Sequence, residues 1–156
     1  MAENIKMEAK TLLIIGGFYH IGWALFDATW PWLFQWKQQL KNTDDINKVL
    51  PYITSRLLII VYLAISFISF FHIDELQNSR IGKTFCIFVS LYWISRAVMQ
   101  IQYFGFSRAN QMIPPENSPF KKITEHVSNS IMSLGFFVYF LLGSSLYVVP
   151  IFLSDN

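Results

Sequence analysis

The stretch LLIIGGFYHIGWALFDATWPWLFQW, residues 12–36, decides the fold, because one helix of this length crosses a lipid bilayer. It is too long for the apolar core of a signal peptide, which spans about 7 to 15 residues before a small-residue cleavage site. We therefore interpret it as a retained membrane helix. It carries His20 and Asp27, and ionisable groups at membrane depth indicate a functional site.

The composition of the whole chain favours a lipid environment. Of its 156 residues, 53% are hydrophobic and only 14% are charged, and the mean hydropathy is +0.38. A soluble domain carries about 25% charged residues. The net charge is +2, and the 12 Lys and Arg are dispersed, which argues against nucleic-acid binding. Cys86 is the only cysteine, so one chain cannot form a disulfide or a cysteine-based zinc site.

Four apolar segments are each long enough to span the membrane. Without internal repeats or long linkers, they predict one domain over residues 1–156, an all-α polytopic membrane protein with four transmembrane helices in an up-and-down bundle. The predicted spans are residues 11–36, 52–72, 84–106 and 123–153.

Several residues mark the expected boundaries of these spans. Pro31 ends or kinks the first helix, because proline lacks a backbone donor. Thr43 or Asp44 caps a short surface helix in the following connection, and Pro51 suits the first turn of the second span. The loop at residues 107–122 holds three prolines and is expected to be irregular.

The orientation of the chain follows from Lys and Arg in the short loops. The side that bears the termini carries four such residues, whereas the opposite side carries six. The positive-inside rule therefore predicts that both termini lie on the non-cytoplasmic side.

Two charged residues of different helices are expected at one depth. Asp27 lies nine residues before Trp36, and Arg96 lies ten before Phe106. At about 1.5 Å per residue, each is about 14 Å from the same membrane face. The two helices run in the same direction, so Asp27 and Arg96 can pair, which lowers the cost of charge in lipid.

Further polar residues extend this predicted site. Tyr92 and Gln100 lie one helical turn on either side of Arg96 and share its face. Arg56 faces the same half of the membrane, and His20 lies seven residues before Asp27 on nearly the same face of the first helix. Together they predict a polar pocket that opens toward the side of the long loops.

Structural explanations stand beside the functional ones. The charged pair can simply fix helix register, and Arg56 can extend to the headgroups. His20 can be a neutral imidazole bonded to a neighbouring helix. Neither His72 nor His126 is level with it, which argues against bis-histidine haem. Small and hydroxylic residues are expected to let the helices approach closely: Gly16, Gly17, Gly135, Gly143, Ser66, Ser69, Ser130, Ser133, Ser144 and Ser145.

The function favoured by this pattern is a non-enzymatic membrane protein that binds a small anionic or amphipathic ligand. No nucleophile–base arrangement, phosphate loop, metal site or cofactor site is predicted. The expected partners are the bilayer, the ligand, and a homo-oligomer or complex partner. One alternative is an accessory or assembly subunit of a larger membrane complex, and another is a small membrane enzyme or haem carrier. The predicted ligand-binding residues are Asp27, Arg96, Gln100, His20, Arg56 and Tyr92.

Overall fold

The computed structural model describes residues 2–103, 105, 119, 121 and 129–154. The described residues form helices and no strands. The helices are α1 (Ala2–Leu33), α2 (Trp36–Gln39), α3 (Asp45–Phe71), α4 (Ile73–Asn78), α5 (Arg80–Tyr103) and α7 (Asn129–Ser154). Four of them are long and apolar enough to cross a membrane, over Ile5–Leu33, Asp45–Phe71, Arg80–Tyr103 and Ser130–Leu153. The predicted all-α membrane fold with four spans is confirmed.

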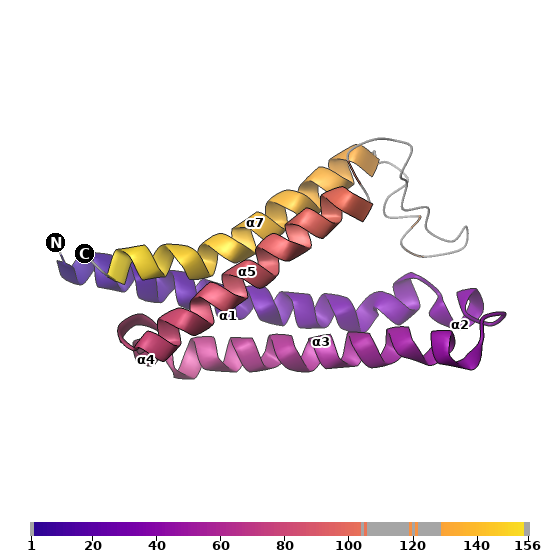
Figure 1. Cartoon of the computed structure of the whole chain (residues 1–156), viewed down its shortest axis with the longest axis horizontal. Helices are drawn as coiled ribbons and strands as arrows, with labels where there is room; N and C mark the ends of the chain where they lie inside the picture. Colours follow the sequence, from indigo (N-terminus) through magenta and orange to yellow (C-terminus); the bar gives the residue numbers. More distant parts are fainter. Residues whose placement is uncertain (1, 104, 106–118, 120, 122–128, 155–156) are drawn as a thin grey trace.

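The long helices form two pairs (Figure 1). α1 packs along α3, and α5 packs along α7, while α7 also contacts α1. The two termini lie at the same end of the molecule, as expected for four alternating spans. At the opposite end, the α5/α7 pair diverges from the α1/α3 pair. The space between the pairs at this end is where the candidate site lies.

The helix α1 does not end at Pro31, which was one of the two effects expected of this proline. The helix runs through this proline to Leu33, and the chain turns at Gln35, which has a left-handed φ of 49°. α1 also begins at Ala2, earlier than expected. A proline removes only one helical hydrogen bond, and membrane helices tolerate that loss when neighbouring groups compensate for it.

The prediction of a separate surface helix before the second span is wrong, because the two form one helix, although this helix begins directly after Asp44, one of the two expected cap residues. α3 begins at Asp45, and Asp44 stands before it in an extended conformation, with its Oδ1 accepting a 2.6 Å hydrogen bond from Asn47 Nδ2. Pro51 therefore lies inside the helix and not in its first turn. α5 begins at Arg80, four residues before the predicted start, and residues 106 and 123–128 and most of the 107–122 loop lie outside the described residues.

The outer surface of the helices is apolar. Phe18, Leu57, Phe88 and Phe152 are each 58% to 68% exposed, on the four long helices respectively. In water such a surface would drive aggregation, whereas in a bilayer it faces the acyl chains. The interior is instead aromatic and polar, and its completely buried side chains include Trp93, Tyr62, Tyr147 and His20.

Hydroxyl groups join helices inside this interior, as the sequence predicts. Ser66 Oγ of α3 donates a 2.9 Å hydrogen bond to the Gly17 carbonyl of α1. The Ser90 and Ser144 hydroxyls of α5 and α7 lie 2.6 Å apart. Because lipid tails are as apolar as the helices, such bonds and close packing replace the hydrophobic effect in holding membrane helices together.

Gly82 marks a very close approach between two helices. A Cβ atom at this position of α5 would overlap the backbone carbonyl oxygen of Glu75 and lie 2.5 Å from Leu76 Cα, both in α4. Backbone atoms cannot move aside as a side chain does, so only glycine fits. This contact sets the turn between α3 and α5.

We expect Gly82→Ala to lower the free energy of unfolding by about 1 to 3 kcal/mol, because it overpacks α4 against α5. The measurement is reversible unfolding in mixed micelles, followed by circular dichroism. The matched control is Gly135→Ala in α7, where a Cβ meets no atom of the described residues within 4 Å. Its stability should stay the same or rise by up to about 1 kcal/mol. Equal losses in both variants would contradict the packing explanation.

Candidate functional site

His20 is the centre of a hydrogen-bond network that joins all four spans. Its Nε2 accepts a 3.1 Å hydrogen bond from the indole N–H of Trp93, which can only donate. The ring proton therefore sits on Nδ1, which donates to the Gly16 carbonyl at 2.8 Å. The Tyr147 hydroxyl lies 3.2 Å from Nδ1 and 2.7 Å from the Ser69 hydroxyl. Both ring nitrogens of this buried histidine are thus taken up by other side chains and backbone.

Asp27 and Arg96 lie on the side of this network that is nearer the open end. Asp27 is only 3% exposed, and its Oδ1 has no hydrogen-bond partner within the described chain. Arg96 is half-buried, and its Nε likewise lacks a partner there. The two residues interact electrostatically but form no direct ion pair. The structure therefore places Asp27 and Arg96 near each other, but the two side chains do not form an ion pair.

Two tyrosines complete the polar cluster. The Tyr62 and Tyr92 hydroxyls, from α3 and α5, lie 2.7 Å apart. Both tyrosines interact electrostatically with Asp27 and Arg96. Ser55 of α3 donates to the backbone carbonyl of Asp27 at 3.2 Å. Polar groups of three helices therefore surround the unpaired charges.

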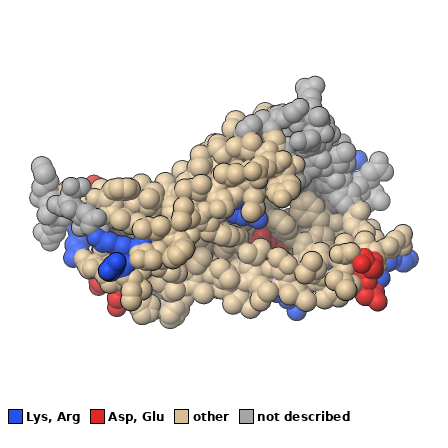
Figure 2. Space-filling view, in the orientation of Figure 1, with Lys and Arg blue, Asp and Glu red and all other residues tan. Residues whose placement is uncertain are grey.

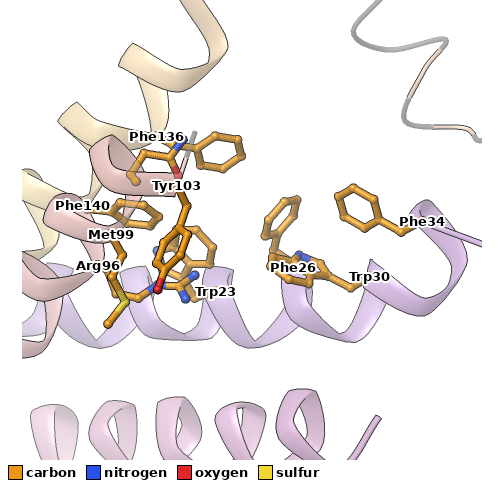
Figure 3. A pocket seen from close by; sticks show the side chains of 10 residues that line it. Trp23, Phe26, Trp30, Phe34, Arg96, Met99, Tyr103, Phe136 and Phe140 are labelled. Carbon is orange, nitrogen blue, oxygen red and sulfur yellow. The ribbon is translucent and has the colours of Figure 1, made fainter. Parts of the chain in front are cut away.

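A pocket of about 300 Å³ lies next to this cluster, between α1 on one side and α5 and α7 on the other (Figure 3). Of the ten described residues that line it, seven are aromatic, and only Arg96 and Gln100 are strongly polar. These ten residues are Trp23, Phe26, Trp30, Phe34, Arg96, Met99, Gln100, Tyr103, Phe136 and Phe140.

Phe140 organises the inner wall of the pocket. Its ring stacks on Trp23 at a centroid distance of 5.4 Å and an angle of 26°, and on Phe136 at 6.2 Å and 27°. The guanidinium carbon of Arg96 lies 5.4 Å from the Phe140 centroid, within range of a cation–π interaction. The cation is therefore held against an aromatic face.

The hollow is visible from the side of the molecule (Figure 2). Basic and acidic groups lie together in it, between the two helix pairs, whereas the surrounding described surface is largely uncharged. The spans run roughly from left to right in this view. The hollow therefore opens sideways, toward the lipid that would surround the helices.

The predicted site residues are placed in different parts of this arrangement. Arg96 and Gln100 line the pocket, and Gln100 Nε2 also donates to Ser133 Oγ at 3.1 Å. Asp27 and Tyr92 belong to the polar cluster behind it, and His20 belongs to the adjoining network. Arg56 is exposed on α3 and is absent from the lining.

Most of the aromatic residues that line the pocket were not predicted from the sequence. A signal for them exists in α1 and directly after its last residue, where Trp23, Phe26, Trp30 and Phe34 follow one another at intervals of three or four residues. This spacing places the rings along one side of the helix. The pocket residues of α7 and the role of Tyr62 depend on how the helices are rotated about their axes. The sequence contains no comparable pattern that predicts these rotations.

These features define a multi-pass integral membrane protein with a buried polar cluster beside an aromatic pocket. No protein-family model matches the chain, and no match is found among curated proteins or solved structures.

We expect Trp93→Phe to destabilise the protein by about 1 to 2 kcal/mol, because the ring is retained but His20 Nε2 is left buried without its donor. The control is Trp32→Phe, since Trp32 is 64% exposed. Its effect should be below about 0.5 kcal/mol. Unfolding in mixed micelles measures both variants, and equal stability of the two would contradict the network's role.

Proposed function

We propose that this protein binds a small amphipathic molecule with an anionic group in the pocket between α1, α5 and α7. The proposal rests on the position of Arg96 and on its lack of a direct partner. This arginine lines an aromatic pocket inside the membrane-spanning region, yet it has no direct ion pair or side-chain hydrogen bond with any described residue.

An unpaired guanidinium in a low-dielectric setting is costly unless a partner compensates for it. Asp27 offsets the charge of Arg96 without bonding to it, so the donors of Arg96 are left for another acceptor. A carboxylate or similar group suits this place, because the planar guanidinium forms paired, charge-assisted hydrogen bonds with such anions.

The remainder of the pocket suits an apolar body. Aromatic rings surround the space, and the indole N–H group of Trp30 also lacks a hydrogen-bond partner within the described chain. Ligand pockets commonly combine a mostly apolar lining with a few polar groups that fix orientation. Arg96 is the group that selects for charge, whereas the rings enclose the rest of the molecule.

Asp27 has a supporting role in this proposal. Its buried carboxylate balances Arg96 when the pocket is empty and keeps the guanidinium near its observed place. A bound anion brings a second negative charge to the same cluster. Asp27 is then the group that exchanges a proton, with the hydroxyls of Tyr62 and Tyr92 beside it.

Native mass spectrometry of protein released from mild detergent tests the proposal. The wild type should carry a defined small-molecule adduct, and Arg96→Gln should lower its occupancy about 10- to 100-fold, the equivalent of a lost charge-assisted bond. Arg56→Gln is the matched control, because it removes the same charge from an exposed position of α3. Its adduct should stay within about twofold of the wild type.

Two outcomes would contradict the proposal. One is an adduct that Arg96→Gln and Asp27→Asn leave unchanged, with stability unchanged as well. The other is a bare chain found only with a foreign subunit, which would favour the role of an assembly subunit and reduce the buried charges to a structural clamp.

A further inference from the structure

The pocket has a direction within the membrane. Its aromatic rings on α1 run from Trp23 to Phe34, eleven residues or about 16 Å along the helix. Arg96 lies at the inner end, because its guanidinium sits against Phe140, which stacks on Trp23. The outer end, near the end of α1, carries Trp30 and Phe34 (Figure 3). The charge is therefore deep, and the apolar lining extends outward.

The order of charged and apolar groups in this pocket is the reverse of their order in a bilayer lipid. A lipid of the nearer leaflet keeps its head group at the membrane surface and extends its chains toward the midplane. In this pocket, its head group would meet Phe34 and its chains would meet Arg96. Arg96 lies seven residues before the end of α5, about 10 Å below it. A compact molecule that enters with its acid inward avoids this mismatch.

The walls favour a flat molecule over a flexible chain. Trp23, Phe136 and Phe140 lie within 26° to 27° of parallel in successive stacks, and Trp93 stacks on Phe140 at 23°. Aromatic ligands gain stacking energy on such faces in addition to the area they bury. A saturated chain gains only the buried area, and it loses conformational freedom when it is confined.

The local charges favour a monoanion. The cluster holds one cation, Arg96, and one carboxylate, Asp27, with Tyr62 and Tyr92 as neutral neighbours. Each further negative charge in this low-dielectric place adds repulsion with Asp27. A carboxylate adds one such charge, whereas a phosphate monoester adds nearly two at neutral pH.

We infer that the pocket binds a planar aromatic monocarboxylate, acid inward against Arg96 and ring outward among the aromatic side chains. This inference rests on the proposed function and names its ligand class. The stacking partners are Trp30 on α1 and Phe136 on α7, which are partly exposed, because Trp23 and Phe140 are only 3% exposed and already stack on each other.

The test is equilibrium binding of radiolabelled 2-naphthoate to the protein in lipid nanodiscs, with empty nanodiscs measuring partition into lipid. The unlabelled competitors are undecanoate, which has the same number of carbons in a flexible chain, methyl 2-naphthoate, 2-naphthyl phosphate and oleoyl lysophosphatidate. We expect 2-naphthoate to bind at least about tenfold more tightly than each competitor.

Variants locate the site. Arg96→Gln should remove the preference for the acid over its methyl ester. Arg96→Lys, which keeps the charge and supports folding, should weaken naphthoate binding about three- to tenfold because the fork geometry is lost. Trp30→Leu should weaken naphthoate about two- to tenfold and leave undecanoate within about twofold. Arg56→Gln again serves as the control and should match the wild type.

The outcomes separate the two levels of the proposal. The planar-acid inference would be overturned if undecanoate or lysophosphatidate bound as tightly as naphthoate. If Arg96→Gln still weakened the binding of these anions, the anion site itself would stand. Tighter binding of the phosphate would overturn the monoanion argument. Absence of saturable binding by all of these anions to folded wild-type protein would overturn the anion site itself.

Discussion

The arrangement of the helices depends on the hydrogen bonds of His20. Inside a bilayer no water is present to satisfy polar groups, so the imidazole requires its partners from other helices. Trp93 of α5 and Tyr147 of α7 supply them, and Ser69 of α3 joins through Tyr147. One side chain of α1 is thereby linked to every other span. Since each of these bonds needs a short distance, together they restrict both rotation and sliding of the four helices.

The network has a consequence for the open end. It holds the helix pairs together near the middle, where His20 bonds to Trp93 and Gly143 of α7 accommodates the Tyr19 ring of α1. Beyond the network the pairs diverge (Figure 1). Large rings on α1 and α7 line the resulting space without filling it, and a pocket remains. The rigid hydrogen-bond network around His20 thus keeps the pocket at the open end from closing.

The sequence was sufficient for the class of fold but not for the helix orientations. Apolar length and missing charge predicted four spans, because a bilayer requires both. The matching depths of Asp27 and Arg96 followed from counting residues. Helix rotation did not follow from counting, because the lipid-facing surface is as apolar as much of the interior. For this reason Arg56 was expected to face the site, whereas the structure exposes it on α3. Pro31 does not end α1, because a membrane helix tolerates a proline near its end.

The contrast between His20 and the Asp27–Arg96 pair is the strongest physical argument for a binding role at the latter. Both groups lie on α1 or against it, only two helical turns apart along the chain, and both are surrounded by aromatic rings. The fold satisfies the imidazole with three well-placed partners. It leaves Asp27 Oδ1 and Arg96 Nε without any in the described chain, although Tyr62, Tyr92 and Gln100 are close at hand. A polar group serving stability alone gains by being paired, so the unpaired Arg96 donor beside a pocket is better explained by a ligand that accepts a hydrogen bond from it.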